Sequence, residues 1–321
     1  MKKTFLYFCL LFIVQTAFAA DSLYVREQQI PILIDRIDNV LYEMRIPAQK
    51  GDVLNEITIQ IGDNVDLSDI QAIRLFYSGV EAPSRKGEHF SPVTYISSHI
   101  PGNTRKALES YSVRQDEVTA PLSRTVKLTS KQPMLKGINY FWVSIQMKPE
   151  TSLLAKVATT MPNAQINNKP IDITWKGKVD ERHVGIGVRQ AGDDGSAAFR
   201  IPGLVTTNNG TLLGVYDIRY NSSVDLQEKI DIGVSRSTDK GQTWEPMRVA
   251  MTFKQTDGLP HGQNGVGDPS ILVDEKTNTI WVVAAWTHGM GNERAWWNSM
   301  PGMTPDETAQ LMLVKSEDDG K

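Results

Sequence analysis

A turn pattern that starts to repeat constrains the fold of this chain more than any other feature. Residues 237–244 read STDKGQTW, and residues 316–321 read SEDDGK, so both begin with serine, any residue, aspartate, any residue and glycine. Each copy directly follows a predicted strand. A turn that recurs at the same place in successive β units indicates a repeat fold, and for β units this predicts a propeller.

The residue types of the complete copy are those of a turn. Gly241 suits a backbone angle that other residues resist, and Asp239 is suited to accept hydrogen bonds from turn amides. Trp244 is expected to pack into the β unit. With Ser237 and Thr243 these residues are interpreted as structural rather than catalytic.

Short strands are predicted throughout the chain, so we expect an all-β protein. In the first half, residues 57–61 alternate apolar and polar side chains with the period of two that a half-buried strand requires. Further strands without long helices between them favour a β-sandwich; the ranges are 73–77, 94–100, 125–129, 140–147 and 171–175. A short helical patch is predicted at 67–72.

The composition changes near residue 180, where a charged and then glycine-rich stretch marks a domain boundary. We expect a β-sandwich domain over 21–180 and the first units of a propeller over 181–321. Strands of the second part are predicted at 203–207, 212–218, 230–235, 270–273, 280–286 and 310–315. The segments 256–267 and 289–305 are interpreted as insertions.

The first twenty residues predict export. Lys2 and Lys3 precede an apolar run from Phe5 to Val14, and Ala17-Phe18-Ala19 follows as a cleavage region. This pattern is typical of a secretory signal and is too short to span a membrane, so we expect a periplasmic, cell-surface or extracellular protein without stable membrane insertion. Cys9 is the single cysteine, so the mature chain would have neither disulfides nor cysteine-based sites.

The charge balance and the histidine positions exclude further classes of function. Lys and Arg number 34 against 37 Asp and Glu, which argues against nucleic acid as a partner. His183, His261 and His288 are too scattered for a metal site. We expect no metal and no cofactor.

Residues 196–221 predict a β-hairpin with a turn at Asn209-Gly210. A two-residue loop would place Arg200 directly opposite Arg219, provided that no bulge intervenes, and Pro202 weakens that register because it lacks an N–H. Like charges that face each other destabilise a hairpin unless an anion lies between them. The two arginines either form one side of an anion site, or point into solvent or pair with Asp193, Asp194 or Asp217.

Two motifs carry a resemblance to a known family. Residues 199–202, FRIP, followed by the octet at 237–244, resemble the FRIP motif and the Asp box of secreted bacterial exo-α-sialidases, glycoside hydrolase family 33. The resemblance covers most of residues 180–321, and the preceding domain is similar to the β-sandwich of gut-bacterial members. It implies a six-bladed propeller that releases terminal α-linked sialic acids from glycans.

The resemblance also implies roles for individual residues. Arg200 would belong to a trio of arginines that binds the sugar carboxylate, Arg219 would join it in the site, and Asp225 would be the general acid and base. Asp268 and Trp286 would line the sugar pocket. From the residues alone, Asp225 has rivals in Asp217, Glu228 and Asp231, while Asp268 fits a simple turn and Trp286 fits a core position.

The family's tyrosine nucleophile, its glutamate partner and two further arginines would lie beyond Lys321. We therefore expect this chain to be the N-terminal part of a longer protein and to be inactive by itself. The expected partners are sialylated glycans. A trans-sialidase and a non-catalytic sialoglycan-binding protein remain alternatives, the latter with Trp142 and Trp175 in a sugar-binding sandwich.

Overall fold

The computed structural model describes residues 22–27, 29–80, 112–176, 180–289 and 295–321. The predicted secretory signal and the strand predicted at 94–100 lie outside the described residues. The all-β prediction is confirmed: strands dominate, and the only described α-helix is the single turn α3 (Ala295–Asn298). None of the described helices has the length and apolar character needed to cross a membrane.

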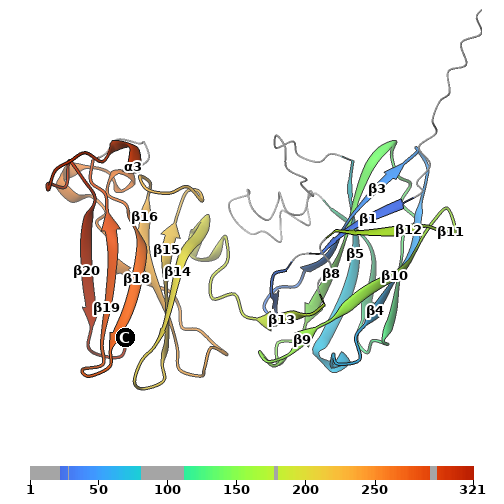
Figure 1. Cartoon of the computed structure of the whole chain (residues 1–321), viewed down its shortest axis with the longest axis horizontal. Coiled ribbons are helices and arrows are strands. Elements are labelled where there is room, and N and C mark those ends of the chain that lie inside the picture. The colour runs from blue at the N-terminus through green and yellow to red at the C-terminus, as the bar shows by residue number, and fades with distance from the viewer. Residues whose placement is uncertain (1–21, 28, 81–111, 177–179, 290–294) are drawn as a thin grey trace, which may run out of the picture.

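The N-terminal part consists of two facing sheets with a shared apolar core (Figure 1). The larger sheet has the order β12 (Asp172–Lys176), β1 (Ser22–Glu27), β3 (Asn39–Ala48), β8 (Gly137–Met147), β5 (Ile70–Gly79), β6 (Val113–Thr119). The smaller sheet has the order β11 (Lys169–Pro170), β10 (Thr159–Ile166), β4 (Leu54–Ile61), β7 (Thr125–Thr129). A third, small sheet joins β2 (Ile32–Leu33), β13 (Arg182–Gly185) and β9 (Lys156–Val157).

The helical patch predicted at 67–72 is shorter than expected. A 3-10 turn, η1 (Leu67–Asp69), follows Asp66, whose side chain accepts a hydrogen bond from the backbone N–H of Ser68. The chain then enters β5 at Ile70 because its next apolar side chains are buried in the sandwich core. Because of tertiary packing, residues 70–72 of the patch are part of a strand rather than a helix.

The C-terminal part consists of two sheets that pack face to face. The first is a four-stranded meander of β14 (Ala198–Thr206), β15 (Leu212–Arg219), β16 (Ile230–Ser237) and β17 (Arg248–Met251). The second contains β18 (Val266–Asp274), β19 (Thr279–Trp286) and β20 (Gln310–Ser316). Strand β18 packs across β14, β15 and β16. Short 3-10 turns occur at η2 (Asp193–Gly195), η3 (Thr256–Gly258) and η4 (His261–Gln263).

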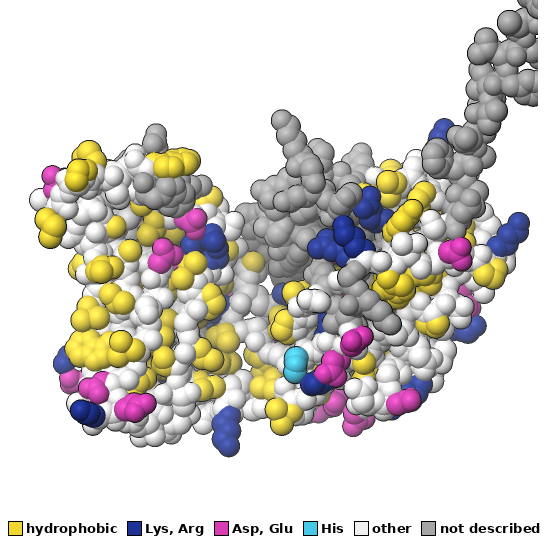
Figure 2. Space-filling view, in the orientation of Figure 1, with side chains coloured by type: hydrophobic (Ala, Val, Ile, Leu, Met, Phe, Trp, Pro, Cys, Tyr) yellow, Lys and Arg dark blue, Asp and Glu magenta, His cyan; other side chains and the backbone are white. Residues whose placement is uncertain are grey.

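The core of this part lies between the two sheets. Val215 and Ile232 from the first sheet meet Val266, Val282 and Ala284 from the second, and all five are buried. The outer face of the second sheet differs, because Leu311 and Leu313 of β20 are 81% and 57% exposed. Figure 2 shows apolar side chains along this edge of the molecule, where β20 lies in Figure 1.

The octet at 237–244 and the six residues 316–321 form matching turns. The hydroxyl of Ser237 donates to Asp239 Oδ1 at 2.8 Å and accepts from the N–H of Gly241, whose φ is 88°. The backbone N–H of Thr243 also donates to Asp239 Oδ1, and these bonds, led by the Thr243 hydroxyl, lower the pKa of Asp239 to about 2. In the second copy, Ser316 makes the corresponding bonds to Asp318 and Gly320. Trp244 packs against Gly214 of β15.

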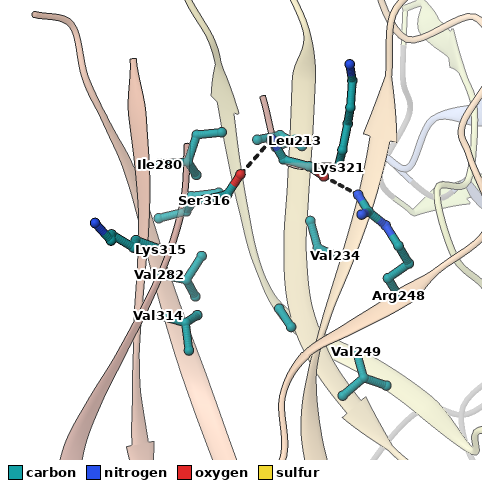
Figure 3. A pocket seen from close by; sticks show the side chains of 13 residues that line it. Leu213, Val234, Arg248, Val249, Ile280, Val282, Val314, Lys315, Ser316 and Lys321 are labelled. Atoms are coloured by element: carbon teal, nitrogen blue, oxygen red, sulfur yellow. Dashed lines mark hydrogen bonds between the residues drawn. The ribbon is translucent and has the colours of Figure 1, made fainter. Parts of the chain in front are cut away.

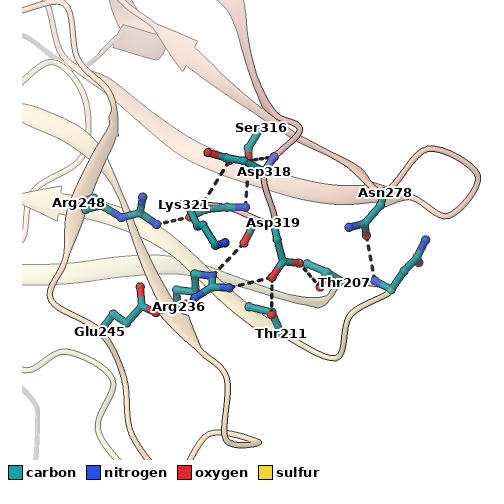
Figure 4. A network of polar contacts seen from close by, with 12 residues as sticks. Thr207, Thr211, Arg236, Glu245, Arg248, Asn278, Ser316, Asp318, Asp319 and Lys321 are labelled. Carbon is teal, nitrogen blue, oxygen red and sulfur yellow. Dashed lines mark hydrogen bonds and ion pairs between the residues drawn. The ribbon is translucent and has the colours of Figure 1, made fainter.

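A polar network at this end of the sheets ties the second octet to the first hairpin (Figure 4). Asp319 accepts hydrogen bonds from the hydroxyls of Thr207 and Thr211, both at 2.6 Å, and from Arg236 Nη2 at 2.8 Å. Burial acts to raise the pKa of Asp319, but these hydrogen bonds outweigh it and hold the pKa below its ordinary value. One carboxylate thus connects β20 with both sides of the β14–β15 turn.

Replacement of Asp319 by alanine is expected to lower the free energy of unfolding by about 2–3 kcal/mol, because three donors lose a charged acceptor. Urea denaturation of the two proteins measures this loss. Since the pKa is lowered in the folded state, the contribution is complete above the ordinary pKa and disappears as the pH falls below it. Glu317→Ala, at an exposed neighbour that pairs with Lys315 outside the network, serves as the control. Equal losses in the two variants would contradict the network's role.

A cavity of about 230 Å³ lies beside this network, between the two sheets (Figure 3). Apolar side chains of both sheets form its walls, and Arg248 and Lys321 lie at its rim; the walls include Leu213, Val234, Ile271, Ile280, Val282 and Val314. It lies at the turn end of the hairpin, where β15 and β19 begin, whereas Arg219 and Trp286 lie where those strands end. The cavity is therefore separate from the predicted site.

Candidate active site

The predicted register of the β14–β15 hairpin is wrong. Thr207 and Thr211 bond across the turn, so three residues, 208–210, form the loop, with Gly210 in the left-handed conformation at φ 80°. Nearer the site a bulge interrupts the pairing between Arg200 and Gly203, where Ile201 has a φ of 52°. Arg200 therefore lies opposite Asp217, and Arg219 lies opposite Ala198.

The two arginines nevertheless meet at a common anion, the side chain of Asp225. Arg200 Nη1 donates to Asp225 Oδ1 at 2.8 Å, and Arg219 Nη1 donates to the same oxygen at 2.6 Å. Both guanidinium groups also donate to the backbone carbonyl of Ser223, at 2.9 and 3.0 Å. The loop after β15 thus supplies the negative partner that two neighbouring cations require.

The members of this cluster differ in their exposure. The side chains of Arg200 and Asp225 are each 42% exposed, whereas the side chain of Arg219 is 1% exposed. Asp225 therefore contacts the buried guanidinium of Arg219 and is also exposed to solvent. Asp225 is thus the acidic group of this cluster that a bound molecule could reach from solvent.

Asp217 is the buried counter-charge of Arg219. Its Oδ2 accepts from Arg219 Nε at 3.0 Å and from Nη2 at 2.7 Å, and its side chain is 1% exposed. Burial raises the pKa of Asp217 to about 6, while the hydrogen bonds and charge of Arg219 act in the opposite direction. Sequence reasoning considered Asp217 only as a partner for an arginine or a rival to Asp225, although its spacing of two from Arg219 places both on one face of a strand.

Asp268 approaches the same cluster through its backbone. Its N–H donates to Asp217 Oδ1 at 2.8 Å, and its φ is 56°, which is uncommon for a residue other than glycine. The bulge in β18 between Gly267 and Ser270 produces this turn and leaves the Asp268 side chain exposed. The turn predicted at Gly-Asp-Pro is therefore present, and the role of Asp268 in a sugar pocket stays a prediction.

Trp286 lies in the core between the sheets. It is 8% exposed, stacks on Phe253 with ring centroids 4.5 Å apart, and contacts the edge of His288. The core interpretation therefore describes its packing. Trp297 of α3, in the insertion after β19, is 73% exposed.

The rival carboxylates have other partners. Asp231 accepts hydrogen bonds from the Tyr220 hydroxyl and pairs with His261 Nε2 at 2.8 Å. Glu228 accepts from Asn221 and from the backbone N–H of Lys229. Among the four candidates, hydrogen bonds to both arginines are found for Asp225.

The loop that carries Asp225 is held by the insertions. Leu226 packs with Ile230 and with Ala295 of α3, and the N–H of Ala295 donates to the carbonyl of Leu226 at 3.0 Å. Gln227 bonds to Thr287 after β19. The insertion after β19 therefore supports the residue next to Asp225. The described residues contain no group of three His, Cys, Asp or Glu side chains suited to a metal ion.

Comparisons with known proteins identify relatives of this chain. Residues 20–170 match the family model for the N-terminal domain of BNR-repeat neuraminidase. A sialidase of Bacteroides fragilis is 56% identical over 100% of this chain and 60% of its own length. A sialidase of Paraclostridium sordellii is 35% identical over 38% of this chain and 28% of its own length.

A solved structure extends the likeness to three dimensions. The Hadza microbial sialidase Hz136 is 60% identical and superposes with a TM-score of 0.80 over 93% of this chain and 57% of the solved chain. The chain thus spans about 60% of the length of the relatives that it matches along its whole length. In sequence and in fold, this chain is thus similar to sialidases along its whole length, and its first part matches the N-terminal domain of BNR-repeat neuraminidase.

Proposed function

We propose that the complete protein is an exo-sialidase that hydrolyses terminal α-linked sialic acids from glycans. The observation that carries the proposal is the meeting of Arg200 and Arg219 at the half-exposed Asp225. A site for sialic acid needs cations for the sugar carboxylate and a proton donor for the leaving oxygen, and this end of the hairpin offers both. The names of the similar proteins support the same activity.

In the proposed mechanism, Arg200 binds the sugar carboxylate. Among the described residues, its side chain donates from Nη1 to Ser223 and Asp225, and it is 42% exposed. A guanidinium has five N–H donors in a planar fork, so donors remain for a carboxylate at the exposed edge. Arg219 is buried and has less freedom, so it acts as a fixed positive charge beside Asp225.

Asp225 would protonate the departing glycosidic oxygen and then remove a proton from the attacking water. For the covalent step we propose a tyrosine nucleophile, because the substrate already carries a negative charge that a second carboxylate would repel. We also propose that the two C-terminal sheets are the first blades of a propeller. Their face-to-face packing and their matching turns support that arrangement.

The assay is incubation of the complete protein with 3′-sialyllactose and measurement of free sialic acid. We expect release of sialic acid, and we expect Arg200→Met to raise KM about 10–100-fold through the loss of charge-assisted hydrogen bonds. Lys240→Met, at the remote octet turn, is the control for loss of a surface charge. Sialic acid transferred to an added acceptor would indicate a trans-sialidase, and binding without release would indicate a glycan-binding protein; either result would reject hydrolysis.

A further inference from the structure

Asp217 contacts two separate segments of the candidate site. Its side chain is buried on the face of β15 that packs toward the second sheet, and its two carboxylate oxygens have different partners. Oδ2 accepts from Arg219, and Oδ1 accepts from the backbone N–H of Asp268. A single carboxylate therefore joins the hairpin to the start of β18.

The contact with Arg219 divides the donors of that guanidinium. Nε and Nη2 point to Asp217, which leaves Nη1 to donate to Ser223 and Asp225. Because a guanidinium is planar, fixing one edge fixes the direction of the other. The orientation of the charge beside Asp225 thus depends on the carboxylate behind it.

The contact with Asp268 requires a close approach of the chain. A Cβ added to Gly267 would lie 3.4 Å from both carboxylate oxygens of Asp217, so the backbone passes next to the acid. The hydrogen bond from the Asp268 N–H holds this residue at a φ of 56° and directs its exposed side chain away from the core. The same carboxylate therefore sets the position of a second polar group at the site.

We propose that Asp217 is a positioning residue, which fixes Arg219 against Asp225 and directs the exposed side chain of Asp268 to the sugar site. The proposal rests on the proposed sialidase function for the identity of the ligand. It assigns to Asp217 no contact with substrate and no proton transfer.

Asp217→Asn is the most direct variant, because it keeps the shape of the side chain and replaces one acceptor oxygen by an NH₂ group. An NH₂ group accepts neither the Arg219 donors nor the Asp268 N–H, so one of the two contacts is lost. Asp231→Asn is the matched control. Asp231 is also a buried aspartate, on the adjacent strand β16, but its hydrogen bonds go to Tyr220 and His261.

The first measurement is the ¹⁵N NMR signal of the Arg219 Nε–H in this chain, assigned with Arg219→Lys. We expect a resolved signal in slow exchange with water in the original protein and in Asp231→Asn. In Asp217→Asn we expect the signal to move and its exchange to accelerate at least tenfold. The second measurement is titration of the complete protein with 3′-sialyllactose, for which we expect the Kd to rise about 10–100-fold in Asp217→Asn and to stay within about twofold in Asp231→Asn.

The outcomes separate this proposal from the proposed function. A folded Asp217→Asn protein with unchanged Arg219 signal and unchanged Kd overturns the positioning role. Failure of the original protein to bind 3′-sialyllactose counts against the proposed function, while the Nε–H comparison still decides whether Asp217 positions Arg219.

A pH titration of the unsubstituted protein gives the test if Asp217→Asn does not fold. The charged groups around Asp217 are Arg219 and, through the same cluster, Arg200, Asp225 and Asp268. The pKa of Asp217 is raised to about 6, so its carboxyl ¹³C shift should titrate near that pH. We expect the Arg219 Nε–H signal to move with the same midpoint, and independent titration of the two groups overturns the proposal.

Discussion

Replacement of Arg219 by methionine is expected to lower the free energy of unfolding by about 3–5 kcal/mol near neutral pH. The substitution removes the positive partner of the buried Asp217 carboxylate, whose side chain is 1% exposed. Water does not reach this position to compensate, so the remaining charge is costly. Urea unfolding followed by tryptophan fluorescence measures the loss, because most tryptophans of the chain lie in the C-terminal part.

Arg200→Met is the control for this prediction. Arg200 donates to the same oxygen of Asp225 as Arg219 does, but its side chain is 42% exposed. Screening by solvent should limit its loss to about 1 kcal/mol or less. Similar losses in the two variants would show that burial does not determine the strength of these ion pairs.

The effect of Arg219→Met should also depend on pH, with a sign that follows from Asp217. The pKa of Asp217 is already raised to about 6 by burial, and removal of Arg219 raises it further. A carboxyl with a raised pKa favours the folded state below its ordinary pKa and loses that contribution as the pH rises through the folded value. The variant should therefore be closest to the original protein near pH 4–5 and furthest from it near pH 8.

Replacement of Asp225 by alanine is expected to lower kcat for 3′-sialyllactose about 10²–10⁴-fold in the complete protein, since this is the usual contribution of a general acid. The natural leaving group needs a proton as the glycosidic bond breaks. An aryl sialoside with an acidic phenol needs little help, so its cleavage should be lowered much less. Steady-state kinetics with both substrates measure the difference.

Glu228→Gln is the control, because Glu228 lies in the same loop region and bonds to Asn221 rather than to the arginines. We expect its kcat to stay within about threefold. Near-normal turnover of 3′-sialyllactose by Asp225→Ala would remove Asp225 from the role of acid. An equal loss with both substrates would instead indicate that Asp225 acts only by holding the arginines.

Several strands could be predicted from the sequence because each needs only a local pattern, whereas β1, β3, β6 and β10 were not predicted. Residues 57–61 alternate in polarity and form part of β4, and the ranges predicted in the second part fall within or close to β14–β16 and β18–β20. The domain boundary near residue 180 stays a prediction, made from a change in composition. A local pattern does not determine the register, that is, which residues of two neighbouring strands pair.

The hairpin shows why the register was missed. A two-residue loop and a three-residue loop both use Asn209-Gly210, and they differ only in whether Asn208 pairs. The bulge at Ile201 adds a second offset, which depends on packing against the second sheet. The family resemblance names Arg200, Arg219 and Asp225 as site residues but does not predict their mutual contact, and the part of Asp217 depends on the folded arrangement of β15 and β18.

Trp286 shows that a local pattern also does not determine contacts between distant residues. A tryptophan at the end of a strand next to a Gly-Asp-Pro turn fits either a sugar pocket or a core. Its ring lies against Phe253, which is 33 positions earlier in the chain. No local pattern records a contact between residues that distant.

The bulge in β14 changes the faces of the sheet on which the side chains of the FRIP motif lie. Beyond the bulge, Gly203 shares the inward face with Val215, and uninterrupted alternation from that point would bring Phe199 to this face and send Arg200 to the other. The irregular step at Ile201 and Pro202 exchanges the two, so Phe199 meets Tyr216 while Arg200 joins Asp225. Ile201 and Pro202 therefore determine on which face of the sheet the Arg200 side chain lies. In an unbroken strand, the phenyl ring of Phe199 would occupy that face instead of the guanidinium of Arg200.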